Sequence, residues 1–242
     1  KKLVHQGMIL GENGIKMGKR FPEFVVNPSD IVRDYGADTL RLYEMFMGPL
    51  EVSKPWSTTA VAGAKKFINR VWTFFTEPAN IVDADDGKLT KVYHQTVKKV
   101  TSDFEQLGFN TAIAQMMVFV NEIYKVGHCP REFAEGFIKM MSCITPHVGE
   151  EMWQLLGHDN TIAYEPWPTY DEEKCKDNEV TIAVQVNGKM RGTVVMDADL
   201  DNDTVVQNVL ANEKIAAFLQ KNGGNIVKTI VVKNKLVNLI VK

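Results

Sequence analysis

Two short basic stretches carry the residue types best suited to binding phosphate. The first is Lys16–Arg20, KMGKR, which places three cations within five residues just after the turn signal Asn13-Gly14. Mobile ammonium groups on such a loop can follow phosphate oxygens as negative charge builds up in a transition state. A solvated basic turn would have the same composition, so these residues alone leave both interpretations open.

The second stretch is Asn187–Gly192, NGKMRG, which contains another Asn-Gly turn signal. Lys189 and Arg191 are two residues apart, so on a strand both would point to one face and could contact backbone phosphates. Residues 180–242 hold eight Lys and Arg against five Asp and Glu, whereas residues 151–179 hold two against eight. An anionic partner would therefore meet the C-terminal segment, although simple solvation also accounts for this composition. Four more lysines could extend the surface: Lys228, Lys233, Lys235 and Lys242.

The overall composition is that of a globular protein. Of the 242 residues, 45% are hydrophobic and 24% charged, with a formal net charge of -2, which excludes a disordered chain. No run approaches the roughly 18 to 20 consecutive apolar residues of a membrane span. The three cysteines form no CxxC pair, and His128-Cys129 has no matching second pair, so neither disulfides nor a metal site are predicted. The start is unlike a signal peptide, so we expect a cytoplasmic protein.

The elements that must position the two basic stretches fall into three parts. Residues 1–35 alternate short apolar runs with turn signals and have no core of their own, as the end of a larger domain would. Within residues 36–170, apolar residues recur at helical spacing, which predicts a helical bundle. One such stripe comprises Val61, Ala64, Phe67, Ile68, Val71, Trp72 and Phe75. Residues 171–179 are acidic and aperiodic, which predicts a linker.

Residues 180–242 change to a period of two. Two β runs flank the second Asn-Gly turn, a helical stretch follows over about 202–221, and further β runs lie at 226–232 and 236–241. This pattern predicts a small α/β module.

Two motifs in the bundle have a structural interpretation. In GADTLRLY, Gly36 breaks the preceding helix and Asp38 can cap the next one, so we favour a packed helix over a direct RNA contact. Glu150 and Glu151 follow Pro146 in the early turns of another helix, where they would complement the helix dipole. The histidines His94 and His147 are expected in the bundle or at its surface.

Several longer strings occur in a fixed order after the KMGKR loop. They are VVNPSDIVRDYGADTLRLYEMFMGP, KPWST, HQTVKKVTSDFEQLGFNTAIAQMMVFVN, ITPHVGEEMWQLLG, EPWPTYDE, VQVNGKMRG and KLVNLIV. Taken together, they resemble class I aminoacyl-tRNA synthetases, and among these the leucyl enzymes most closely. The resemblance spans nearly the whole chain. It implies the end of the catalytic domain over 1–35, an anticodon-binding type of helical bundle over 36–170 and a tRNA-binding module over 180–242.

The resemblance also implies roles for the first basic loop, which matches the KMSKS loop of the family. Lys16 and Lys19 take the places of its two lysines and would act on the phosphates of ATP, with Met17, Gly18 and Arg20 beside them. Two positions depart from the family, because Gly18 and Arg20 replace serines. The following FPEF also implies a one-residue insertion.

A leucine–tRNA ligase is the activity that this resemblance implies. The complete enzyme would use ATP and Mg²⁺ to form leucyl-adenylate and then transfer leucine to tRNA(Leu), with catalysis depending on alignment and charge neutralisation. The family's HIGH sequence, leucine pocket and editing insertion lie upstream of the loop and have no counterpart here, so this chain is expected to be inactive alone. It would be a monomer without membrane contact, with tRNA contacts at Lys189, Arg191, Lys228, Lys233 and Lys235.

Two alternatives remain at this point. One is another synthetase of the same subclass, for isoleucine, valine or methionine, although these relatives lack the VQVNGKMRG and KLVNLIV strings at their ends. The other is a non-catalytic RNA-binding or scaffold protein that retains the architecture. Lys16 and Lys19 favour an enzyme, whereas the altered residues of the loop favour a binder.

Overall fold

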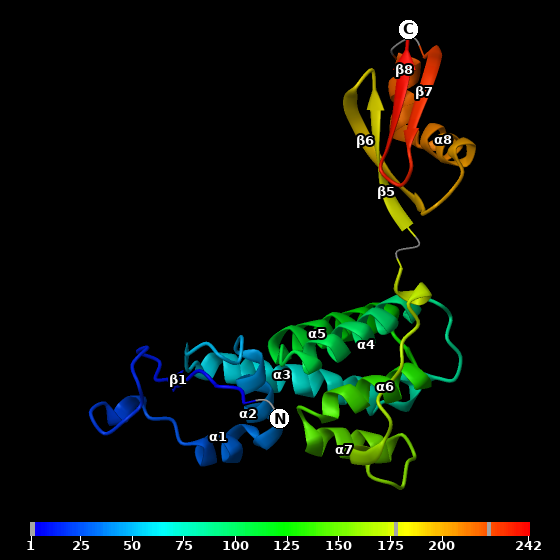
Figure 1. Ribbon diagram of the computed structural model, residues 1–242. Helices are drawn as coiled ribbons and strands as arrows, with labels where there is room; N and C mark the ends of the chain where they lie inside the picture. Colours follow the sequence, from blue (N-terminus) through cyan, green and yellow to red (C-terminus); the bar gives the residue numbers. More distant parts are fainter. Residues whose placement is uncertain (1–2, 177–178, 222–223) are drawn as a thin grey trace. The chain divides into compact units, whose positions relative to one another are not determined.

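The computed structural model describes residues 3–176, 179–221 and 224–242 (Figure 1). The chain divides into two compact units, Lys1–Cys175 and Lys176–Lys242, and each has its own hydrophobic core. The boundary expected near residue 35, within the first unit, stays a prediction.

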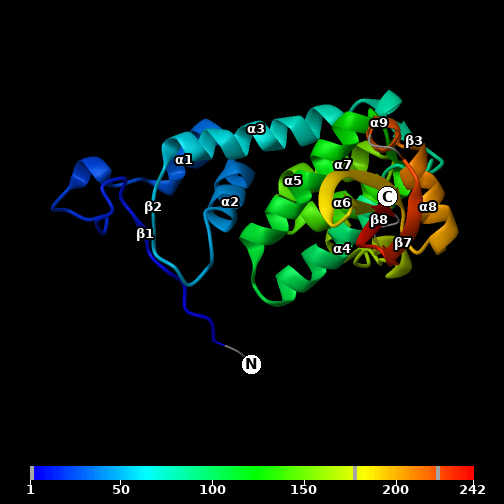
Figure 2. The same ribbon diagram turned by 90° about the horizontal axis from the view of Figure 1, so that it is seen from above.

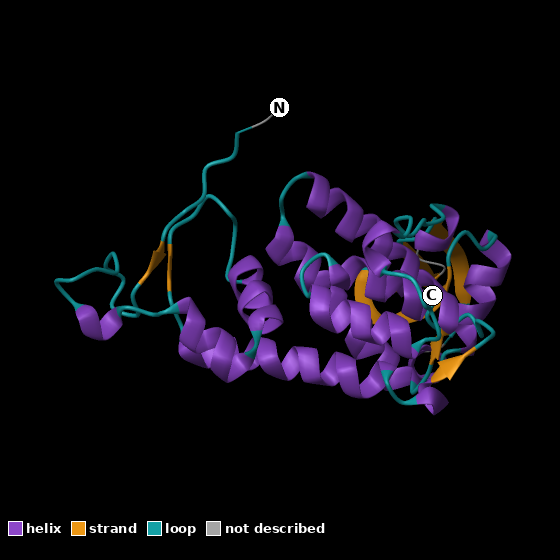
Figure 3. Ribbon diagram, turned by 90° about the horizontal axis from the view of Figure 1, so that it is seen from below, coloured by secondary structure: helices purple, strands orange, loops and turns teal. Residues whose placement is uncertain are grey.

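Seven α-helices among the described residues build most of the first unit, hereafter the helical unit (Figure 3). Two short parallel strand pairs accompany them, β1 (Ile9–Leu10) with β2 (Lys54–Pro55) and β3 (Ile81–Val82) with β4 (Cys129–Pro130). The helices are α1 (Pro28–Tyr35), α2 (Ala37–Phe46), α3 (Thr58–Phe75), α4 (Thr90–Glu105), α5 (Phe109–Val126), α6 (Arg131–Ser142) and α7 (Pro146–Leu155).

Local sequence signals set several of the helix ends. The Asn27 side chain accepts a hydrogen bond from the Ser29 N–H, and Pro28 occupies the first position of α1. At α3, the Ser57 side chain accepts from the Ala60 N–H. Gly127 ends α5 with φ of 84°, a left-handed conformation that costs glycine little.

The apolar stripes of the helices meet in one core, as the helical periodicity predicts. Val61, Val71 and Phe137 are fully or almost fully buried, and α3 runs along the outside of the packed helices (Figure 2). The helical bundle is therefore confirmed. The stripe predicted from the sequence is too wide at Trp72, which is 37% exposed.

The predicted linker is partly ordered against the bundle. Glu172 forms an ion pair with Lys98 of α4 at 2.6 Å, and the Asp171 N–H donates to His94 Nδ1 at 3.1 Å. The first half of residues 171–179 is thus held by side chains on α4. Residues 177 and 178 lie outside the described part of the chain.

The second unit, hereafter the C-terminal module, is a four-stranded sheet with two helices. Its strands have the order β6-β5-β8-β7, in which β5 and β8 are parallel and the outer pairs antiparallel. The bounds are β5 (Glu179–Val186), β6 (Lys189–Asp197), α8 (Asn202–Ala211), α9 (Glu213–Lys221), β7 (Ile226–Val232) and β8 (Leu236–Val241). The predicted α/β module is confirmed.

One feature of the module differs from the sequence prediction, because the stretch over 202–221 forms two helices. Asn212 separates them in an extended conformation, and its side chain accepts from the N–H groups of Lys214 and Ile215 at the start of α9. This local cap competes with a continuous helix. Both helices pack on one face of the sheet, and the break lets α9 reach the edge strand β6.

Candidate nucleic-acid interface

The KMGKR loop extends from the β1 end of the helical unit. Lys16 forms an isolated antiparallel bridge with Leu10, and the Gly11 N–H donates to the Ile15 carbonyl at 2.8 Å. Gly14 closes this turn with φ of 75°. The side chains of Lys16 and Lys19 are exposed, and neither has an ion-pair partner among the described residues.

Met17 anchors the loop, while the residues on either side of it are exposed to solvent. The Met17 side chain is half-buried against the helical core, and its Sδ lies 3.5 Å from the Val26 N–H. The Arg20 guanidinium lies over the Phe21 ring at 5.4 Å, which gives this extra cation a fixed neighbour. A Cβ added to Gly18 would meet no atom within 4 Å, so the serine of the related loops would fit here.

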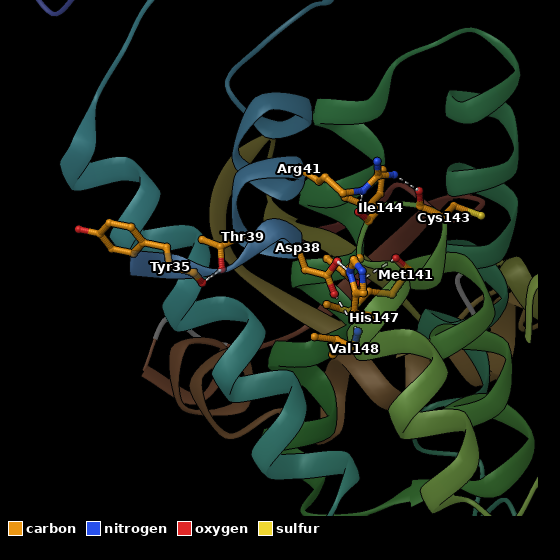
Figure 4. Close-up of polar contacts among 10 residues, drawn as sticks. Tyr35, Asp38, Thr39, Arg41, Met141, Cys143, Ile144, His147 and Val148 are labelled. Carbon is orange, nitrogen blue, oxygen red and sulfur yellow. Dashed lines mark hydrogen bonds and ion pairs between the residues drawn. The ribbon is translucent and has the colours of Figure 1, made fainter. Parts of the chain in front are cut away.

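The GADTLR segment joins α2 to the junction of α6 and α7 (Figure 4). The Arg41 Nε donates to the Ile144 carbonyl at 2.8 Å, and its Nη2 donates to the Cys143 carbonyl at 3.2 Å. The Asp38 carboxylate is buried, accepts from the Val148 N–H at 2.7 Å and lies 2.8 Å from His147 Nδ1. These residues therefore hold helices together, in line with the preferred interpretation of a packed helix.

Asp38 does not cap its own helix. Gly36, with φ of 94°, is the N-cap of α2. Asp38 instead accepts a hydrogen bond from a free backbone N–H in the first turn of α7. The dipole prediction for Glu150 is also wrong, because α7 has no acid in its first turn. Glu150 accepts from the Thr161 hydroxyl and the Ile162 N–H, and the hydrogen bond from Thr161 holds the pKa of Glu150 below its usual value.

The second basic stretch forms a tight hairpin between β5 and β6. Asn187 and Gly188 have φ of 50° and 77°, the two positive values that a two-residue hairpin turn requires. The Asn187 side chain exchanges hydrogen bonds with the backbone of Val241, at 3.1 Å and 3.0 Å. The Gly188 N–H donates to Asn238 Oδ1 at 3.1 Å. The turn is thus fastened to β8.

Lys189 and Arg191 lie on the same face of the sheet, although simple alternation is not the reason. Lys189 pairs with Val186, whose side chain is buried under the helices, and directly opposed residues share a face. A register shift then leaves Arg191 as an extra residue, and its guanidinium lies 4.3 Å from the ring centre of Phe218 on α9.

Two more cations complete this surface, and the sequence analysis missed them. Lys214 and Lys221 are exposed and stand four and three residues from Phe218, so they share its flank of α9. We call the set Lys189, Arg191, Lys214 and Lys221, grouped around Phe218, the hairpin–helix surface. The spacing of residues 214, 218 and 221 predicts that they share one flank of a helix. Only the structure shows that this flank lies beside Arg191.

Three of the four remaining predicted lysines do not extend that surface. Lys233 forms an ion pair with Asp199 at 2.9 Å and holds the pKa of Asp199 below its usual value. Lys235 precedes Leu236, which pairs with Ala183, so it lies about 10 Å or more along the sheet from the Asn187 turn. Figure 1 shows the β7–β8 turn and the β5–β6 turn at opposite ends of the module.

Lys228 lies elsewhere again. It pairs with Ile240, next to the buried Leu239, so its side chain points to the face of the sheet without helices. It also belongs to β7, the edge strand opposite β6. The five residues predicted as tRNA contacts are therefore divided among three places.

The remaining histidine and cysteine candidates have ordinary structural surroundings. His128 Nε2 lies 3.2 Å from Asp86, while Cys129 is fully buried and burial raises the pKa of its thiol. Among the described residues, no three His, Cys, Asp or Glu side chains form a group that could hold a metal ion. No described helix is long and apolar enough to cross a membrane.

Comparisons with known proteins agree with this arrangement. Residues 86–207 match a protein family described as the anticodon-binding domain of tRNA ligase. The whole chain is similar to the LeuRS AgnB2 of Agrobacterium radiobacter K84, solved as a ternary complex with tRNA and LeuAMS. That likeness has a TM-score of 0.73 and 26% sequence identity, and covers 98% of this chain and 33% of the other. The chain thus spans about a third of the length of this relative.

Proposed function

The chain belongs to the anticodon-binding domain family of tRNA ligases, and from this premise we propose that it is the C-terminal part of a leucyl-tRNA synthetase. The complete cytoplasmic enzyme would ligate leucine to tRNA(Leu) through leucyl-adenylate. This part would supply the ATP-phosphate loop and the tRNA-binding surfaces, and it would not aminoacylate by itself. The observation that carries the proposal is the likeness to LeuRS along 98% of the chain, combined with the hairpin–helix surface.

The KMGKR loop fits contact with a polyphosphate. Lys16 and Lys19 are exposed cations on a turn that Met17 anchors, so they can approach phosphate oxygens while the backbone stays in place. Each ammonium would offset charge as pyrophosphate departs, which is electrostatic rather than acid–base catalysis. Mg²⁺ would come with ATP. Arg20, held over Phe21, would add a further positive charge beside Lys19.

The hairpin–helix surface fits contact with the tRNA backbone. Lys189 and Arg191 come from a hairpin that Asn187 fastens to β8, so the backbone that carries the two cations is held in place. Lys214 and Lys221 widen the surface along α9. Structured RNA is recognised mainly through its shape and phosphates, which suits a rigid cationic surface without a base-reading groove.

A salt titration tests the proposal. The 242-residue chain is titrated with a leucine tRNA transcript and with a tRNA that has a short variable arm, at several salt concentrations. We expect tighter binding of leucine tRNA and an affinity that falls steeply with salt, since bound phosphates release counterions. Equal binding of both tRNAs would contradict the assignment to the leucyl enzyme, and binding of neither would contradict a tRNA-binding role.

A further inference from the structure

The sequence contains three Asn-Gly pairs, the dipeptide most prone to spontaneous loss of the asparagine side-chain amide. Glycine has no side chain to hinder its own amide nitrogen, which can attack the side-chain carbonyl of the preceding asparagine. Asn13-Gly14 and Asn187-Gly188 lie in turns of the described chain, whereas Asn222-Gly223 lies outside the described residues. Both described pairs can undergo the same chemistry, so their surroundings decide which one reacts.

The side chain of Asn13 is exposed and held by one hydrogen bond. Its Oδ1 accepts from the Ile15 N–H at 3.0 Å, a local contact that asparagine often makes with the backbone two residues on. Among the described residues, none accepts a hydrogen bond from its Nδ2. No protein group therefore retains the nitrogen that must leave.

The hydrogen bond from Ile15 favours attack on Asn13. Attack on the carbonyl carbon places negative charge on Oδ1, and the Ile15 N–H already donates to that atom. The Gly14 N–H donates to the Gly11 carbonyl at 2.8 Å, so the turn must open before the Gly14 nitrogen can react. Because residues 12–16 are all exposed, this local opening costs little free energy.

Asn187 belongs to the same dipeptide, but its side chain is fastened at both ends. Its Nδ2 donates to the Val241 carbonyl at 3.1 Å, and its Oδ1 accepts from the Val241 N–H at 3.0 Å. The Gly188 N–H donates to Asn238 Oδ1 at 3.1 Å. Both partners belong to β8, a strand inside the sheet. Attack on Asn187 must therefore break three contacts with β8.

The related pair Asp86-Gly87 could form the same cyclic imide, but Asp86 is also protected. Its Oδ2 lies 2.8 Å from Lys88 Nζ, and its Oδ1 accepts from the Lys88 N–H at 3.2 Å. The hydrogen bond from the Lys88 side chain holds the pKa of Asp86 below its usual value. An ionised carboxylate is a poor target for a nucleophile.

We propose that Asn13 is a site of spontaneous deamidation in the folded chain and that its contacts with β8 protect Asn187. The Gly14 nitrogen loses its proton and forms a bond to the Asn13 Cγ. The Cγ–Nδ2 bond breaks, and Nδ2 takes up a proton and leaves as ammonia. Water then opens the cyclic imide at either carbonyl and gives aspartate or isoaspartate. Water is the only co-reactant.

The modification changes the turn that leads into the KMGKR loop. Either product adds a negative charge beside Glu12, in the turn that ends at Lys16. This charge lowers the positive potential of the loop. Isoaspartate also lengthens the main chain within the turn. The inference does not depend on the proposed function, although it implies that a modified chain would bind polyphosphate more weakly.

The test follows both sites in the folded 242-residue chain. The chain is kept in mildly alkaline buffer made with heavy-oxygen water, so that each deamidated residue gains labelled oxygen, and its peptides are identified by mass spectrometry. We expect the Asn13 peptide to gain the label at least several-fold faster than the Asn187 peptide. Equal rates, or a faster reaction at Asn187, would overturn the inference.

The same incubation in concentrated urea is the matched control. Unfolding removes the contacts of Asn187 with Val241 and Asn238, so both sites should then react at similar rates. If Asn187 stayed several-fold slower in urea, its local sequence would explain the difference, and protection by β8 would be wrong.

The variant Asn13→Gln tests the route of the reaction. Glutamine must form a larger ring more slowly, so the label at residue 13 should disappear while the rate at Asn187 is unchanged. Thermal unfolding checks that the variant is folded. In the wild type, the products at residue 13 should include isoaspartate. Aspartate alone would contradict attack by Gly14, because direct hydrolysis of the amide gives no isoaspartate.

Discussion

The helical unit and the C-terminal module use their polar residues in opposite ways. In the helical unit, Asp38 and Arg41 hydrogen-bond to the backbone of α7 and of the α6–α7 junction, and so join α2 to these helices. In the module, Lys189 and Arg191 point outward from a hairpin whose turn is fastened by Asn187. A sequence motif shared with a family thus holds helices together in one unit and forms an exposed surface in the other. Similarity alone does not tell the two apart.

The two cores also differ in size, and this leads to the largest expected effect. Leu239 is fully buried in the small core of the module, and Ile138 is fully buried in the large core of the helical unit. Leu239→Ala should cost about 2–5 kcal/mol, enough to unfold a module of this size. In amide hydrogen exchange, we expect protection to be lost across residues 179–242 only.

Ile138→Ala is the matched control for that experiment. It should lower the stability of the helical unit by a similar free energy while the module keeps its protection. Loss of protection in both units on either substitution would show that they unfold as one cooperative unit, and would contradict the claim that their cores are separate.

A smaller effect is expected from Asp38→Ala. The substitution leaves the Val148 N–H at the start of α7 without its acceptor, which should cost about 1–3 kcal/mol in the free energy of unfolding. The control is Asp30→Ala, which removes an exposed ion pair with Arg33 and should cost less than about 1 kcal/mol. Urea unfolding measures both. Equal costs would contradict the role of Asp38 as a joint.

The pH dependence of stability gives a third test. Burial, followed by the nearby Lys174, lowers the pKa of His94, and its Nδ1 accepts from the Asp171 N–H. The unfolded chain, with a histidine pKa near ~6.5, therefore binds more protons than the folded chain. Stability should fall as the pH drops below about 6.5.

The variant His94→Gln should weaken this dependence, as seen in urea unfolding at pH 8 and pH 5.5. The variant His5→Gln, at an exposed position, is the control for the loss of one histidine. A steeper loss of stability on acidification in His94→Gln would have the wrong sign for a buried neutral histidine.

The smallest effect is expected from Gly18→Ser. A Cβ at this position meets no atom within 4 Å, and the backbone is not left-handed there. The substitution should change the free energy of unfolding by less than about 0.5 kcal/mol. A larger destabilisation would show that the KMGKR loop packs more tightly than its exposed lysines indicate.

Local patterns predicted the elements well because their causes are local. The helical spacing around Val61 and Val71 predicted a buried stripe, and Asn187-Gly188 predicted the hairpin. Asp38 could be predicted to cap a helix, but the N–H group that donates to its carboxylate belongs to α7, about a hundred residues away in sequence, and no local pattern identifies that helix.

The candidate surface was harder to predict for a related reason. Alternation along β6 placed Lys189 and Arg191 correctly, although a bulge produces this result. Lys233 and Lys235 are also positively charged, but they lie at the opposite end of the module from Lys189 and Arg191. Only the strand order and the register reveal this. Lys214 and Lys221 join the surface because Asn212 divides the helical stretch and lets α9 reach β6.

The most direct test of the central claim compares the two ends of the module. Lys189→Ala with Arg191→Ala removes two cations from the hairpin–helix surface, and Lys233→Ala with Lys235→Ala removes two from the other end. Both variants and the wild type are titrated with leucine tRNA against salt. We expect the first variant to bind more weakly, with a slope reduced by roughly two, and the second to bind like the wild type. The same slope in all three proteins would contradict tRNA binding by this surface.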